Sequence, residues 1–87
     1  MEIEFTSKAE AQLTYWKITG NDAVLKKIRN LIASILETPF HGIGKPEPLK
    51  YELSGYWSRR ITDEHRLVYE ITNDKVVIIQ CRFHYSK

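Results

Sequence analysis

The spacing of the apolar residues changes on either side of residues 38–48, and this change constrains the fold more than any other feature of the chain. Between residues 22 and 37, apolar side chains recur every three or four positions, which is typical of an amphipathic helix. Beyond residue 48 they alternate with polar ones, which is typical of strands that bury one face. The segment between them, TPFHGIGKPEP, contains two glycines and three prolines and predicts a loop. The chain therefore joins a helical half to a strand-rich half.

The first half predicts a short strand followed by two helices. Residues 2–5 alternate as a strand does. Ser7 begins a capping-box spacing, in which side chains bond the free backbone N–H groups of a helix start, and Gly20 suits the end of that helix. Asn21 or Asp22 can cap the second helix. Because the break between the two helices is short, we expect an antiparallel helical hairpin.

The second half predicts a four-stranded antiparallel meander. Turn-forming residues separate four alternating segments, over residues 49–53, 56–61, 65–71 and 75–83. The complete chain, residues 1–87, is then expected to form one α+β domain with both helices on one face of the sheet. The other face should stay partly open.

Alternation also predicts the face that each polar side chain takes. If the apolar side chains of the strands face the helices, alternation places basic side chains from four strands on the open face. These are Lys50, Arg60, Arg66, Arg82 and, if the last strand continues, His84. Clustered cations repel one another unless an anion lies among them, so the pattern suits a polyanionic ligand. The alternative is a solvated face neutralised by Glu52 and Glu70.

The residue types on and beside this face match those that RNA cleavage requires. A 2′-hydroxyl can attack the adjacent phosphate if a base takes its proton, an acid protonates the departing 5′-oxygen and cations balance the charge. Glu47, on a loop stiffened by two prolines, and His84 could supply the proton transfers. Tyr85 could stack on a base. The plainer interpretations are an exposed loop carboxylate, a terminal imidazole and a terminal ring that covers the core.

Composition narrows the classes of function. The net charge is +2, and residues 45–87 hold the excess with eight basic against six acidic side chains, so any contact with nucleic acid should be local. Cys81 is the only cysteine, which excludes an internal disulfide, and its position in an apolar strand predicts a buried, inert thiol. His41 and His65 are expected to be structural. Neither a cofactor nor a metal is expected. No apolar stretch approaches membrane-spanning length, so a cytoplasmic protein is expected.

Four blocks of sequence point to a family. In order, TPF-x-G-x-GKPEPLK, LSG-aromatic-WSRRI, EHRLVY and CR-aromatic-HY resemble the YoeB toxins of bacterial toxin–antitoxin pairs, within the RelE/ParE superfamily. The resemblance implies a RelE-like fold and a ribosome-dependent mRNA endoribonuclease that cuts codons in the 30S A site without a metal. It implies Glu47 as general base, Arg66 as the phosphate-stabilising cation and His84 as general acid. Tyr85 would help to hold the substrate, and Lys50 and Arg60 would join the basic surface.

The resemblance also implies partners for this chain, and two rival functions remain open. A YefM-type antitoxin would fold a disordered tail over the toxin, and a second copy of the chain would form a homodimer. The rival functions are a ParE-like toxin that inhibits DNA gyrase and a non-catalytic module that binds RNA or an antitoxin. The pairing of Glu47 with His84 argues against the gyrase function.

Overall fold

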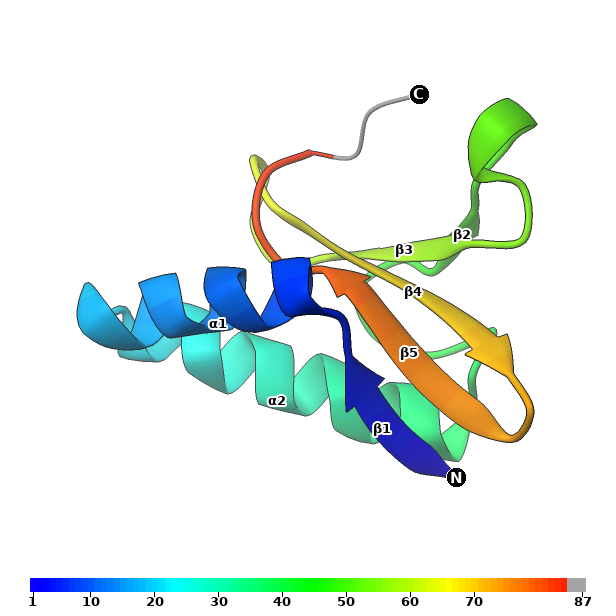
Figure 1. Ribbon diagram of the computed structural model, residues 1–87, viewed down its shortest axis with the longest axis horizontal. Coiled ribbons are helices and arrows are strands. Elements are labelled where there is room, and N and C mark those ends of the chain that lie inside the picture. The colour runs from blue at the N-terminus through cyan, green and yellow to red at the C-terminus, as the bar shows by residue number, and fades with distance from the viewer. Residues whose placement is uncertain (85–87) are drawn as a thin grey trace.

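The computed structural model describes residues 1–84, and within them two helices lie against a five-stranded sheet (Figure 1). The elements in chain order are β1 (Glu2–Phe5), α1 (Ser7–Ile18), α2 (Asp22–Glu37), β2 (Glu47–Pro48), a 3₁₀ turn (Tyr51–Leu53), β3 (Trp57–Arg60), β4 (Arg66–Thr72) and β5 (Lys75–Gln80). Among the residues described, no helix has the length and apolar character needed to cross a membrane.

The strand order across the sheet is β1-β5-β4-β3-β2. Strands β2 to β5 pair antiparallel in sequence order, and β1 lies parallel to β5 at the opposite edge. The two helices run antiparallel on one face (Figure 1). The α+β class predicted from the sequence is confirmed.

Both helices begin at a capping side chain. The Oγ1 of Thr6 accepts a hydrogen bond from the Ala9 amide, so Thr6 is the N-cap of α1 and the prediction of Ser7 is wrong by one residue. Threonine and serine are equivalent in this role, which made the two positions hard to separate. Asn21 caps α2 as predicted, because its Oδ1 accepts from the Val24 amide.

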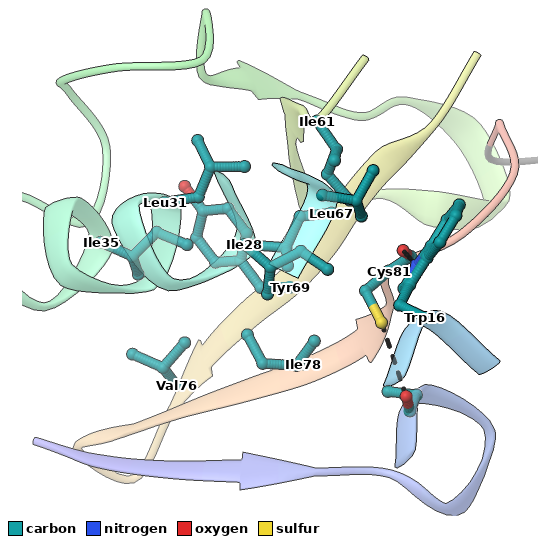
Figure 2. Packing of buried hydrophobic residues seen from close by; sticks show 12 residues of the cluster. Trp16, Ile28, Leu31, Ile35, Ile61, Leu67, Tyr69, Val76, Ile78 and Cys81 are labelled. Carbon is teal, nitrogen blue, oxygen red and sulfur yellow. Dashed lines mark hydrogen bonds between the residues drawn. The ribbon is translucent and has the colours of Figure 1, made fainter. Parts of the chain in front are cut away.

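The core lies between the helices and the inner face of β4 and β5 (Figure 2). Helix α2 contributes a buried stripe at the expected three-to-four spacing: Val24, Ile28, Leu31 and Ile35. The sheet contributes Leu67 and Tyr69 from β4, and Val76 and Ile78 from β5. Full burial of such a side chain stabilises the folded state by about 1.5–3 kcal/mol. This core fixes which sheet face remains outside.

The predicted strand over residues 49–53 does not form. The second strand is instead the two-residue β2, and the chain then turns through the 3₁₀ segment, where Tyr51 has a left-handed φ of 59°. That conformation is incompatible with an extended strand. Tyr51, expected to point inward, is 76% exposed.

Over most of β5, the side chains that face the core are the opposite set from the one predicted. Val76 and Ile78 lie in the core, whereas Val77 and Ile79 were expected there. Because residues 76–79 are all apolar, their sequence carries no alternation. A bulge in β5 also changes the facing of its residues. Tyr69 pairs with Ile78, but its neighbour Val68 pairs with Gln80, so one residue of β5 is left between the two pairs. One extra residue inverts the alternation, which returns Cys81 to the core as predicted.

Candidate active site

A pocket of about 220 Å³ opens on the sheet face opposite the helices. Its lining comes from the loop before β2, from β2, β3 and β4, and from the segment after β5: Lys45, Glu47, Ser58, Arg60, Arg66 and His84. Three side chains that are permanently positive at neutral pH thus surround one carboxylate and one imidazole. Such a lining attracts an anion and places proton-transfer groups beside it.

Strand pairing brings the charged residues of this site pocket together. Glu47 of β2 pairs with Ser58 of β3, and Arg60 of β3 pairs with Arg66 of β4. Residues that pair directly across two strands present their side chains on the same face. Ser58 and Arg60 share the outer face, because the residue between them, Arg59, bonds to α2 on the inner face.

The guanidinium of Arg66 is fixed at one of its nitrogen atoms by backbone carbonyl groups. Its Nη1 donates to the carbonyl oxygens of Thr62 at 2.7 Å, Asp63 at 3.1 Å and His65 at 3.1 Å. These three bonds restrict the guanidinium of Arg66, which lines the pocket, and the entropic cost of that restriction is met during folding. A positioned guanidinium binds a phosphate more strongly than a mobile one does.

The loop that leads to Lys45 and Glu47 is anchored by a buried arginine, Arg59, which has no exposed surface. Its Nε donates to the Tyr69 hydroxyl at 3.1 Å, and its Nη1 donates to the Ser34 hydroxyl at 2.8 Å. Its remaining bonds go to loop carbonyl oxygens, those of Thr38, Pro39, His41 and Ile43. Burial raises the pKa of Tyr69, an effect that Arg59 partly opposes.

The end of this loop is fixed against β3. The Arg60 amide donates to the Gly44 carbonyl at 2.7 Å. Gly44 has a φ of 82°, and a Cβ there would lie 2.5 Å from Leu31. Glycine therefore allows the chain to pass tightly over α2 and to present Lys45 at the pocket.

The structure brings together four of the seven predicted site residues, namely Glu47, Arg60, Arg66 and His84. Lys50 is exposed and does not line the pocket, because the strand expected to carry it is absent. Arg82 leaves the basic face, since its Cζ lies 3.4 Å from the centre of the Tyr15 ring of α1. The predicted placement of Arg82 on that face is wrong, and Lys50 lies outside the pocket. Tyr85 lies outside the described residues.

Lys45 and Ser58 line the pocket but were not predicted as site residues. Strand alternation places Ser58 on the same face as Arg60, and Lys45 is the first residue of the KPEP motif, so the sequence contains a signal for both. Lys45 has a left-handed φ of 51°, a loop conformation that residue spacing does not reveal.

A second hollow of about 330 Å³ adjoins the site pocket and shares Lys45 and Arg60 with it. Lys27 of α2 and Asp63 lie among its other lining residues. The basic side chains that line the two hollows are Lys27, Lys45, Arg60 and Arg66. Within residues 1–84, no three His, Cys, Asp or Glu side chains are grouped as metal ligands would be.

Two residues predicted to be structural are so. Cys81 has no exposed surface, and burial raises the pKa of its thiol to about 11, which keeps it protonated at neutral pH. The ring of His65 lies edge-on to Trp16 at 4.9 Å and does not line the site pocket.

The sheet order, the helical pair on one face and the basic pocket on the other define a RelE-like toxin fold. Residues 5–85 match the sequence model of a family described as "YoeB-like toxin of bacterial type II toxin-antitoxin system". A toxin YoeB of Streptomyces coelicolor is 54% identical over 98% of this chain and 100% of its own. The chain belongs to the family of YoeB-like toxins of type II toxin–antitoxin systems.

Solved structures agree with this assignment. A YoeB/ParE toxin from Agrobacterium tumefaciens has a TM-score of 0.94 and 45% identity, over 98% of this chain and 100% of that one. A YoeB–YefM complex from Staphylococcus aureus has a TM-score of 0.88 and 42% identity, over 98% of both chains. A YoeB from Staphylococcus aureus is described as a dimer in a structure with a TM-score of 0.89, 41% identity and 98% coverage of both chains.

Proposed function

We propose that this toxin is a ribosome-dependent mRNA endoribonuclease that cuts the codon in the 30S A site. The observation that carries the proposal is the site pocket, which combines one carboxylate and one imidazole with three fixed positive charges. The YoeB-type sequence supports the ribosomal setting. A bound phosphodiester would meet both kinds of proton-transfer group in one place.

The chemistry follows from these groups. Glu47 takes the proton of the 2′-hydroxyl, and the resulting oxygen attacks the adjacent phosphorus. The bond from phosphorus to the 5′-oxygen breaks, and His84 in its protonated form gives that oxygen a proton. The products are a 2′,3′-cyclic phosphate and a 5′-hydroxyl. Each positioned acid or base contributes roughly 10²–10⁴-fold to the rate.

The cations act on the phosphate. Arg66 and Arg60, which pair across β3 and β4, stabilise the negative charge that grows on the phosphate oxygens. Lys45 adds a third positive charge from the loop. Tyr85 would hold an RNA base by stacking, as the YoeB pattern implies.

The test is to map cuts in mRNA on translating ribosomes. Wild-type protein should cut in the A site, and Glu47→Gln and His84→Ala should each slow cleavage by about 10²-fold or more. Glu52→Gln and His41→Ala are matched controls, because both residues are exposed and neither lines the pocket. Equal cutting by all variants would remove the assigned roles. Absence of A-site cutting by the wild type, together with inhibition of gyrase supercoiling, would replace the function with that of a gyrase toxin.

The partners are part of the proposal. The Staphylococcus aureus structures, described as a YoeB–YefM complex and a YoeB dimer, support a YefM-type antitoxin and a homodimer for this chain. Co-expression with a YefM-type antitoxin should restore cell growth and yield a stable complex. Light scattering of the free toxin should give the mass of two chains, and a monomer at micromolar concentration would contradict the dimer.

A further inference from the structure

The backbone just before His84 is in an unusual conformation. Phe83 has a φ of 67°, in the left-handed region, and its side chain is 52% exposed. A bulky residue rarely adopts this conformation, which persists only where the surrounding structure enforces it. No burial of the Phe83 ring explains it. The contacts that enforce it therefore bear on where His84 lies.

Three hydrogen bonds hold the Phe83 backbone. Its amide donates to Nδ1 of His65 at 2.8 Å. Its carbonyl accepts from the Arg66 amide at 3.0 Å and from the Gln80 side chain at 2.9 Å. The amide and the carbonyl of Phe83 belong to the two peptide groups that flank its Cα, so these bonds fix the backbone on both sides of the residue.

The His65 ring is fixed in the orientation that this bond requires. Trp16 meets it edge-on at 4.9 Å with an interplanar angle of 83°, and the Trp16 indole is tied to the Cys81 carbonyl at 2.9 Å. Nδ1 can accept this bond only in the tautomer that carries its proton on Nε2. His65 is thus a rigid acceptor set between α1 and the end of the chain.

We infer that His65 is a positioning residue that holds Phe83 in its left-handed conformation and so directs His84 into the site pocket. It does not line that pocket and touches no substrate. The consequence for RNA cleavage rests on the proposed function, whereas the placement of His84 does not. Geometry at a proton donor matters because small displacements of reacting groups lower rates strongly.

Two substitutions separate the effect of the hydrogen-bond acceptor of His65 from the effect of its ring. His65→Asn places an amide oxygen near the position of Nδ1 but lacks the ring. His65→Phe keeps a ring against Trp16 but has no acceptor. His41→Phe, in an exposed loop, is the control for exchanging an imidazole for a phenyl group. Folding of each variant is checked by thermal unfolding.

The first readouts do not need activity. In His65→Phe, hydrogen exchange of the Phe83 amide should be about fivefold faster or more, and the NMR signals of the His84 ring should shift. His65→Asn should keep both close to wild type. Unchanged exchange in His65→Phe, or equal loss in both variants, would overturn the inference.

The second readout is cleavage on ribosomes. His65→Phe should lower the rate of the chemical step by about tenfold or more with little change in ribosome affinity, and His65→Asn should restore most of it. If His65→Phe cleaves RNA at the wild-type rate, the link between His65 and the function of His84 is overturned. If the wild type does not cleave RNA, the proposed function fails, and the exchange and NMR measurements still decide the role of His65.

Discussion

At the scale of single residues, two adjacent arginines have opposite roles. Arg59 is fully buried and donates six hydrogen bonds to neutral acceptors, while Arg60 is exposed and lines the site pocket. Alternation along β3 predicts this division, because neighbouring residues of a strand face opposite sides. Alternation does not indicate what the inward-facing Arg59 binds. Its partners come from α2, the loop and β4.

Replacing each arginine by alanine should separate stability from binding. Arg59→Ala removes the hydrogen-bond donor to the Tyr69 hydroxyl and to several loop carbonyl groups. It should lower the free energy of unfolding by about 3 kcal/mol or more. Arg60→Ala removes an exposed side chain and should change it by no more than about 0.5 kcal/mol. Urea unfolding measures both. Similar losses for the two variants would contradict the anchoring role of Arg59.

At the scale of elements, local signals placed the helices well and the strands less well. The caps and the spacing of apolar residues are read within one or two helical turns, so α1 and α2 appear near their predicted bounds. The strand over residues 49–53 failed because a left-handed turn at Tyr51 interrupts it. The facing of β5 depended on a bulge against β4, which is a relation between two strands.

The corrected cap of α1 can be tested directly. Thr6→Ala should destabilise the protein by about 1 kcal/mol, because the Ala9 amide loses its acceptor. Ser7→Ala should have little effect, since Ser7 is exposed and lies inside the first turn. Thermal unfolding of both variants is the measurement. A larger loss for Ser7→Ala than for Thr6→Ala would restore the cap predicted from the sequence.

At the scale of the whole molecule, charge is concentrated rather than abundant. The net charge is only +2, but the site pocket and the adjoining hollow are together lined by Lys27, Lys45, Arg60 and Arg66. A polyanion that crosses both hollows would meet all four. The affinity of this surface for RNA should therefore depend on salt more than the net charge indicates.

This salt dependence provides a test with a matched control. Binding of a short single-stranded RNA to the Glu47→Gln protein should weaken as salt rises, by about 0.7 in the logarithmic slope for each phosphate contacted. Lys27→Ala should reduce the slope by about that amount, because Lys27 lines the adjoining hollow. Lys26→Ala, its exposed neighbour on α2, should leave it unchanged. Equal slopes for the two variants would confine RNA to the site pocket.

The sequence by itself determined the α+β class, the two helices, the burial of Cys81, the open-face position of Arg60 and Arg66, and the family. These depend on spacing and on motifs, which a single chain carries locally. The tertiary structure alone decided that Lys50 lies outside the site pocket, that Lys45 lines it, that Arg82 packs against α1, and that the Phe83 amide bonds to His65. Each of these depends on a turn, a bulge or a contact between residues far apart in sequence, and alternation along one strand contains no information about such relations.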